Sequence, residues 1–395
     1  MPRYNKHYFF LLILVFLLQG CVSVPKRNPL PKELSDQAQI PGIPWSKIWA
    51  DDPQEAYSEE WFALSREEII SKFPAIFGKP HKYLAISGGG AKGAFGAGFL
   101  AGWSASGTRP EFSMVTGIST GALIAPFAYL GPDYDDEIKE MYTQYSTKDL
   151  IKHRNILSAI MSDATASTKP LRELIKKYYN ETIVDAIARE SKRGRVLEIA
   201  TTNLDAQRPV IWSIGRIAAS SHPQKVELIQ KIILASASIP VAFEPVLIEV
   251  EAGGQTYDEL HVDGGASAQV FLYPTDIDWE RVLKKLEVKE KPEVYVIRNA
   301  HVDSQFNFVN NRLLPIAEST IESLIRTQGI GDLYRIYLST QRDGLNFNLT
   351  YIPKEFDEIS NEMFDPIYMR KLYQLGFEMG QRESSWHHTP PGFEE

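Results

Sequence analysis

Apolar runs of strand length alternate with amphipathic helical segments through the middle of the chain. The runs at 83–86, 196–202 and 293–297 are short and rich in aromatic or β-branched residues. Between them, 135–145 and 227–235 carry apolar residues at helical spacing. This alternation predicts an α/β fold in three layers, with a mostly parallel central sheet covered by helices on both faces. We expect 293–297 to be the last strand of that sheet.

The last quarter of the chain has the pattern of an extension packed on this core. Apolar residues over 313–325 share one helical face, 345–351 alternates as in a half-buried strand, and Asp365 precedes another helix. The predicted domains are therefore a main domain over 82–299 and a mixed helical and strand extension over 300–395.

The N-terminus has the pattern of an export signal. Basic residues precede a nearly unbroken apolar run over 8–18, which is too short to span a bilayer comfortably. The following Leu-Gln-Gly-Cys resembles a bacterial lipobox, whose cysteine becomes lipidated. We expect a signal peptide over 1–20, a lipidated Cys21, and a tether with an N-terminal extension over 21–81. The alternatives are an uncleaved anchor or an ordinary signal peptide with a chance cysteine.

The residues around the cysteine bear on the cellular location, and the net charge bears on the partners. Val22 follows the cysteine, and in similar lipoproteins a residue other than aspartate there favours the outer membrane over the inner one. Cys21 is the only cysteine, so the exported chain has no disulfide to make. A net charge of -8 and a pI near 5.6 argue against a nucleic-acid partner.

A Gly-x-Ser-x-Gly motif lies at 117–121, between an apolar strand at 111–115 and a helix start at 122–125. This is the context of a nucleophile elbow, which holds a serine hydroxyl clear of the backbone. The flanking glycines let neighbouring strands pass close, and helix N–H groups point at the serine, where negative charge develops in acyl transfer. Ser119 is thus a candidate nucleophile; a plain glycine-rich turn is the alternative.

Two further stretches carry candidate chemistry. The glycine-rich turn at 87–96 follows a short strand and exposes several backbone N–H groups, which can hold a phosphate or an oxyanion. The segment 260–265 places Asp263 at the end of a short apolar run, before two glycines. His261 lies on the same face of this extended segment and is the best histidine candidate. Its alternative role is that of a partly buried histidine with a local hydrogen bond.

These three stretches, in this order, resemble the patatin-like phospholipases. The segment 235–240 (Ala-Ser-Ala-Ser-Ile-Pro) is also similar to that family, and the resemblance covers about residues 82–272. One departure concerns the loop after Asp263 and not the acid itself. The family commonly has Asn-x-Pro there, whereas here 266–270 intervene and proline appears only at Pro274.

The resemblance implies a serine-dependent hydrolase of lipid acyl esters, similar to phospholipase A or lysophospholipase, with membrane lipid as its substrate. It implies a dyad of Ser119 as nucleophile and Asp263 as base, with no cofactor and no metal ion. Which lipid is cleaved stays open. A second hypothesis is a catalytically inactive lipid-binding or scaffolding lipoprotein of the same fold.

The resemblance also assigns the glycine-rich turn to the oxyanion. The expected donors are the backbone N–H groups of Gly88, Gly89, Gly90 and Thr120. A Gly89→Ala methyl group is expected to intrude where the oxyanion must sit. Lys92 is expected either to attract a phosphate headgroup or to be a solvated side chain at a helix start.

A dinucleotide site is the main rival chemistry. Gly88, Gly90 and Gly93 satisfy Gly-x-Gly-x-x-Gly, and Glu111 lies where a ribose-binding acid could be sought. That acid should close a strand, however, and Glu111 opens one. A phosphate-binding P-loop is excluded because no Gly-Lys-Ser or Gly-Lys-Thr occurs.

Overall fold

The computed structural model describes residues 27–52, 55–153, 166–273, 277–304, 306 and 308–393. The predicted signal peptide, Cys21 and Pro274 lie outside these residues. No helix in the described ranges is long and apolar enough to cross a bilayer.

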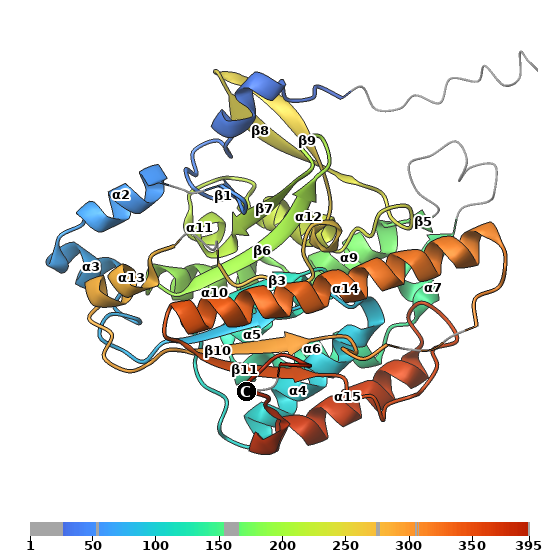
Figure 1. The fold of residues 1–395 in the computed structure, drawn as a ribbon. Coiled ribbons are helices and arrows are strands. Elements are labelled where there is room, and N and C mark those ends of the chain that lie inside the picture. Colours follow the sequence, from blue (N-terminus) through green and yellow to red (C-terminus); the bar gives the residue numbers. More distant parts are fainter. Residues whose placement is uncertain are drawn as a thin grey trace, which may run out of the picture.

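Within the described ranges, nine strands form one mixed sheet in the order β1-β7-β6-β3-β2-β10-β11, with β9 paired to β6 and β8 paired to β9 (Figure 1). Strands β6, β3, β2, β10 and β11 are parallel, and β1, β7, β8 and β9 pair antiparallel. The strands are β1 (Lys47–Trp49), β2 (Lys82–Ile86), β3 (Met114–Ile118), β6 (Val196–Asn203), β7 (Arg208–Ser213), β8 (Val246–Ala252), β9 (Gln255–Asp263), β10 (Glu293–Arg298) and β11 (Asn346–Tyr351). A separate pair joins β4 (Lys152–His153) and β5 (Ala166–Ser167).

Helices cover both faces of the sheet, so the predicted three-layer α/β fold is confirmed (Figure 1). One face packs against α4 (Gly93–Ala105), α5 (Thr120–Leu130), α6 (Asp135–Thr143), α9 (Lys169–Tyr178), α10 (Glu181–Lys192), α11 (Ile214–Ala219), α12 (Lys225–Ser236) and α15 (Pro366–Gly380). The other face packs against α13 (Trp279–Lys285) and α14 (Leu313–Arg342). Shorter or peripheral helices are α2 (Glu55–Ala63), α3 (Arg66–Lys72), α7 (Thr147–Leu150), η1 (Lys32–Gln37), η2 (Gly90–Lys92), η3 (Pro132–Tyr134), η4 (Gly264–Ala266) and η5 (Glu383–Ser385).

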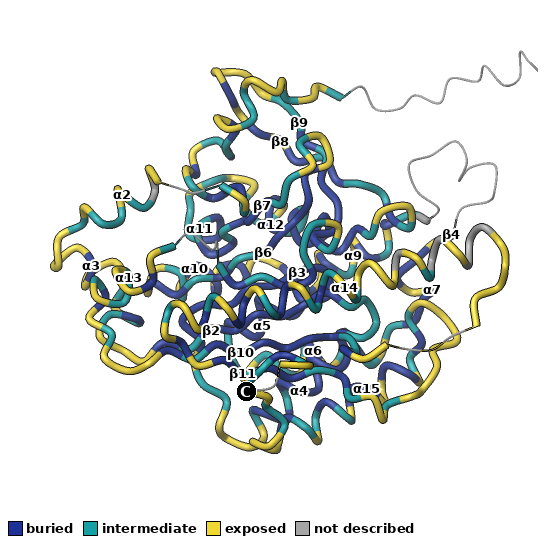
Figure 2. The backbone as a smooth tube through the Cα atoms, viewed as in Figure 1, coloured by how far each residue is buried: buried dark blue, intermediate teal, exposed yellow. Residues whose placement is uncertain are grey.

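The alternation of side chains along each strand divides the core into two layers. In β2, Leu84 and Ile86 face the larger helical layer, while Tyr83 and Ala85 face the layer of α13 and α14. Buried parallel strands need apolar residues on both faces, which is why this strand is an unbroken apolar run. Figure 2 shows the resulting band of buried backbone through the centre of the molecule.

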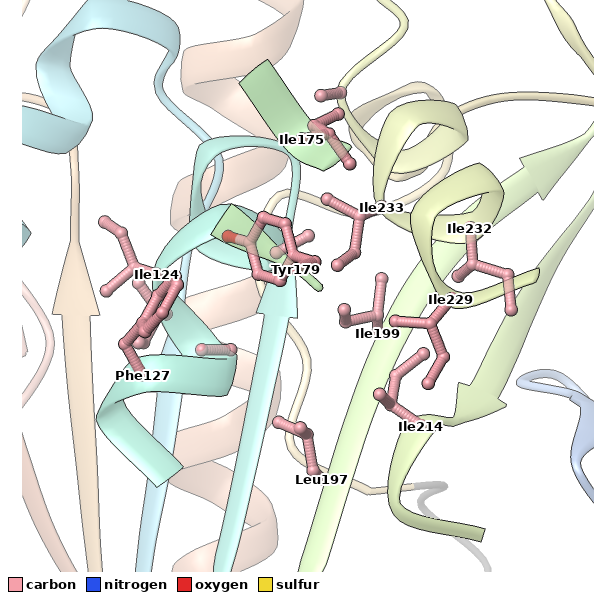
Figure 3. Packing of buried hydrophobic residues seen from close by; sticks show 14 of the residues in the cluster. Ile124, Phe127, Ile175, Tyr179, Leu197, Ile199, Ile214, Ile229, Ile232 and Ile233 are labelled. Carbon is pink, nitrogen blue, oxygen red and sulfur yellow. The ribbon is translucent and has the colours of Figure 1, made fainter. Parts of the chain in front are cut away.

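The larger core layer joins the segment after Ser119 to the central strands. Figure 3 shows Phe127 of α5 beside Tyr179, with Ile199 of β6 facing Ile229 and Ile233 of α12. Each fully buried aliphatic side chain contributes about 1.5–3 kcal/mol relative to its exposed state. Helix α5, which begins directly after Ser119, is therefore held in place by the core residues that it packs against.

The prediction that 293–297 is the last strand of the sheet is wrong. The later segment β11 pairs in parallel with β10, and half of its residues are buried, as the alternation predicts. Residue 299 therefore does not mark the end of the sheet. A strand's place in a sheet depends on long-range pairing, which the alternation along residues 345–351 does not reveal.

Helix α15, near the C-terminus, packs closely against α4, which belongs to the first third of the chain. A Cβ atom at Gly98 would lie 2.0 Å from the carbonyl oxygen of Tyr373, and one at Gly376 would lie 2.2 Å from that of Phe95. Side chains larger than hydrogen would separate the two backbones. The glycines of both helices thus have a packing role that their positions in sequence do not disclose.

Candidate active site

Ser119 occupies a sharp turn between β3 and α5. Its φ of 55° and ψ of -122° lie in a region that residues with a side chain rarely adopt. The two flanking positions are glycine because other backbone atoms approach them closely. A Cβ at Gly117 would lie 2.3 Å from the Gly121 carbonyl oxygen, and one at Gly121 would lie 2.2 Å from that of Ile86. Strand β3 spans Met114–Ile118 and includes Gly117, so the predicted strand at 111–115 begins and ends too early.

A buried serine on α12 holds the strained turn in place. The Ser119 N–H donates to the Ser236 hydroxyl at 3.0 Å, and that hydroxyl donates to the Ala200 carbonyl at 2.7 Å. One side chain thereby ties the elbow to β6. The pattern of segment 235–240 assigns Ser236 no role, because the residues that its hydroxyl contacts lie far away in the sequence.

Asp263 ends β9 beside the elbow. Its carboxylate accepts a hydrogen bond from the Gly265 N–H at 2.7 Å. Burial raises the pKa of Asp263 to about 6, and the neighbouring Ser119 hydroxyl and Gly265 N–H oppose that rise. The structure thus places the predicted nucleophile near the predicted base.

His261 lies on the same strand but takes part in a different network. Its Nδ1 is 2.9 Å from the Thr201 hydroxyl and its Nε2 is 3.2 Å from a Glu259 carboxylate oxygen. Lys47 of β1 forms a 2.7 Å ion pair with Glu259, and burial lowers the pKa of His261. Both ring nitrogens are therefore engaged away from Ser119, as the local hydrogen-bond hypothesis expects.

The glycine-rich turn curls past the elbow, and one of its predicted donors is occupied. The Gly88 N–H donates to the Gln269 carbonyl at 3.0 Å, so it does not face an oxyanion in this structure. Within the described ranges, the N–H groups of Gly89, Gly90 and Thr120 donate to no protein acceptor. These three N–H groups are therefore free to donate to a bound group.

Asn299, just past β10, fixes the shape of this turn. Its N–H donates to the Ser87 hydroxyl at 2.8 Å, its side-chain amide donates to the Ser87 carbonyl at 2.9 Å, and its Oδ1 accepts from Gly96 N–H at 2.9 Å. A Cβ at Gly89 would lie 2.2 Å from the Asn299 carbonyl oxygen. The expected clash of a Gly89 methyl group is thus with Asn299. This corrects the expectation that it would fill the oxyanion position.

Lys92 lies half-buried at the end of η2. Burial lowers its pKa and the neighbouring Arg298 lowers it further, whereas Glu322 has the opposite effect. Lys92 is absent from the wall of the pocket that contains Ser119. The structure therefore keeps it near the glycine-rich turn without bringing it to the nucleophile.

A largely apolar pocket opens beside Ser119. Its wall is formed by Gly90, Thr120, Leu123, Met141, Tyr142, Leu150, Leu171, Leu174, Ile175, Tyr179, Ala237, Ile239, Phe243, Phe364 and Met369. The cavity volume is about 50 Å³, which is room for a few water molecules.

The residues of the rival dinucleotide pattern do not form a nucleotide site. A Cβ at Gly93 would lie 2.1 Å from the Thr120 hydroxyl oxygen, so this glycine is required by packing. Glu111 precedes β3 and pairs with Arg193 at 3.3 Å, whereas the glycine-rich turn follows β2. Since β2 and β3 are parallel, the acid and the turn lie at opposite edges of the sheet, which contradicts the dinucleotide hypothesis.

An α/β sheet with a strained serine elbow, a buried aspartate and an apolar pocket is an arrangement typical of the class of serine acyl hydrolases. Comparison with protein families agrees with this class. Residues 84–276, just under half of the chain, match the family described as patatin-like phospholipase. This part of the chain is therefore similar to the patatin-like phospholipases, whose members are serine hydrolases of lipids.

More distant comparisons add little. The crystal structure of VipD from Legionella pneumophila shares 14% identity, covers 79% of this chain and 68% of its own, and superposes with a TM-score of 0.37. A likeness of this degree carries no functional argument. The comparison with curated protein sequences found no match.

Proposed function

We propose that this protein hydrolyses acyl esters of membrane lipids, as a phospholipase A or lysophospholipase, through a dyad of Ser119 and Asp263. The observation that carries the proposal is that Ser119, in the wall of an apolar pocket, lies close enough to the buried Asp263 carboxylate to lower the pKa of that carboxylate. The family match supports lipid as the substrate class.

In the first half-reaction, Asp263 accepts the hydroxyl proton while the Ser119 oxygen attacks the ester carbonyl. The N–H groups of Gly89, Gly90 and Thr120 donate to the oxygen on which negative charge develops. Collapse of this intermediate expels the lipid alcohol, which takes the proton from Asp263, and leaves an acyl group on Ser119. Water then attacks the acyl-enzyme by the same route and releases the fatty acid.

The environment of Asp263 suits it to act as a base without histidine. A free aspartate with a pKa near 3.9 is a weak base for a hydroxyl. Burial raises the pKa of Asp263 to about 6, closer to neutrality, while leaving it mostly ionised at pH 7.

Lys92 is proposed to attract an anionic headgroup from its position on the glycine-rich turn. In that case Lys92→Ala weakens turnover of an anionic phospholipid more than turnover of a neutral ester. Equal losses on both substrates would contradict this role.

We further propose that Cys21 is lipidated and anchors the protein at the outer membrane. Two or more acyl chains, each contributing about 0.8 kcal/mol per buried CH2, hold a protein stably at a bilayer. Cys21→Ser should then appear in the soluble fraction or remain unprocessed. A variant that matures and stays membrane-bound like the parent would place the anchor elsewhere.

The direct test of the function compares lipid extracts incubated with active and Ser119→Ala protein by mass spectrometry. The proposal predicts loss of one lipid class, with matching fatty acid and either lysolipid or glycerophosphodiester products, only in the active sample. Identical extracts would instead favour the catalytically inactive, lipid-binding hypothesis.

A further inference from the structure

The most exposed large apolar side chains of the described residues lie on a few connecting segments. Among the described residues, Phe308, Phe306, Ile359 and Val241 have the highest exposed fractions of this kind, from 89% to 71%. Together with Met363 and Ile367 they are here called the apolar rim. Isolated exposed apolar residues are ordinary, but a group of this size at one edge marks an interaction site.

The rim residues come from segments that meet at one edge of the sheet. Residues 306 and 308 lie between β10 and α14, and Ile359 and Met363 lie between β11 and α15. These connections run along the side toward which the parallel strands point, where α14 and α15 begin (Figure 1). The same segments are drawn as exposed in Figure 2. Ser119 follows β3 at this edge too.

Two rim residues adjoin the pocket wall in the sequence. Val241 lies between Ile239 and Phe243, which both line the pocket. Met363 is followed by the wall residue Phe364. The segments that carry these rim residues therefore also contribute to the wall of the Ser119 pocket.

Ordered backbone presents part of the rim. The Phe364 N–H donates to the Thr147 hydroxyl at 2.9 Å, and the Thr147 N–H donates to the Phe364 carbonyl at 3.1 Å. Asp365 caps α15 by accepting from the N–H of Ile367 at 2.9 Å. Met363 and Ile367 therefore lie on either side of backbone that these hydrogen bonds hold in place.

We propose that the apolar rim docks onto the surface of a phospholipid bilayer, an inference that rests on the proposed lipid hydrolase function. Burying an exposed phenylalanine or isoleucine in an apolar medium is favourable by about 1.5–3 kcal/mol, so insertion of a few rim residues is sufficient for reversible binding. Docking places the entrance of the pocket at the lipid surface.

The charges near the rim determine which kind of bilayer it fits. The segment 354–362 holds one lysine and four acidic residues, so it does not attract anionic headgroups. The docking is therefore by apolar insertion. It should occur on zwitterionic phosphatidylcholine and change little with salt.

A fluorescent label can identify the face that meets the lipid. Cys21 is the only natural cysteine, so the full chain with Cys21→Ser and Ser119→Ala accepts a single environment-sensitive NBD label at Ile359→Cys. Leu338→Cys is the matched control, because Leu338 is also an exposed leucine-sized residue but lies near the far end of α14. The unprocessed N-terminus is the same in both proteins.

With phosphatidylcholine vesicles, the label at 359 should shift to the blue and brighten about twofold or more, and the label at 338 should change little. Equal responses at the two positions, or none at 359, would overturn the proposal. A shift that depends on protein concentration without vesicles would also overturn it, since a second copy would then cover the rim.

A kinetic comparison of variants that keep Cys21 and Ser119 separates docking from catalysis. The double variant Phe308→Ser/Ile359→Ser should lose most activity on phosphatidylcholine vesicles but keep its activity on a monomeric short-chain ester, with Leu338→Ser as the control. Equal loss on both substrates would contradict the docking role. Because the label experiment uses inactive protein, a failure of the proposed hydrolase function leaves the docking result readable.

Discussion

The hydroxyl of Ser119 lies close enough to the carboxylate of Asp263 to oppose the rise in its pKa, which burial brings to about 6. Ser119 directly follows β3 and Asp263 ends β9, and both strands pair with β6. Their proximity therefore depends on the register of the sheet and not on a flexible loop. It also leaves His261 in a separate network with Thr201 and Glu259.

The first prediction concerns the pH dependence of turnover. Asp263 must be ionised to accept the serine proton, so kcat/KM should rise with pH through about 6 and then level off. Hydrolysis of a monomeric ester between pH 4 and 9 measures this profile. A profile that stays flat between pH 4.5 and 7 would show that Asp263 is not the base.

The second prediction concerns stability. The pKa of Asp263 is 3.8 in the unfolded reference and about 6 when folded, so between these values the unfolded chain ionises first. The free energy of unfolding therefore falls as pH rises, by about 3 kcal/mol in total above pH 6. Asp263→Asn should remove this loss.

Urea denaturation measures that effect. The Asp263→Asn variant should be more stable than wild type at pH 7.5 and close to it at pH 4, while being inactive. A variant that is less stable at both pH values would mean that the ionised carboxylate stabilises the fold.

The third prediction concerns Ser236. Ser236→Ala removes the acceptor of the Ser119 N–H and the link to β6, so the strained turn is held less firmly. We expect kcat to fall about 10- to 100-fold with a smaller change in KM, as a displacement of this kind typically costs. Ser238→Ala is the control, because its hydroxyl bonds only to the Leu234 carbonyl within the described residues. Equal losses in both variants would assign Ser236 a general packing role.

The fourth prediction distinguishes two glycines of the oxyanion turn. Gly89→Ala should displace Asn299 and lower both stability and activity, because its Cβ would lie 2.2 Å from a backbone oxygen. A Cβ atom at Gly90 would have no neighbouring atom within 4 Å. Gly90→Ala should therefore lower the free energy of unfolding only by the cost of its positive φ, about 1 kcal/mol. Thermal unfolding and ester hydrolysis of the two variants measure the difference. A tolerated Gly89→Ala would contradict the close approach to Asn299.

The sequence predicted the parts of the site that depend on local geometry. A serine between glycines after a strand, and an aspartate before glycines, are constrained by the turns they occupy, and both could be located without a structure. Ser236 and Asn299 could not, because serine and asparagine are common and their partners lie about a hundred residues or more away. The same reason explains why β11 was not assigned to the sheet. Its pairing with β10 crosses the long helix α14.

Covalent labelling with a fluorophosphonate tests the central claim most directly, because only an activated serine reacts quickly. The account predicts that peptide mass spectrometry finds the adduct on Ser119 in wild type, at a similar rate in His261→Gln, and at a greatly reduced rate in folded Asp263→Asn. An adduct on another serine would contradict it. So would a folded His261→Gln variant that no longer reacts, since histidine would then be part of the catalytic set.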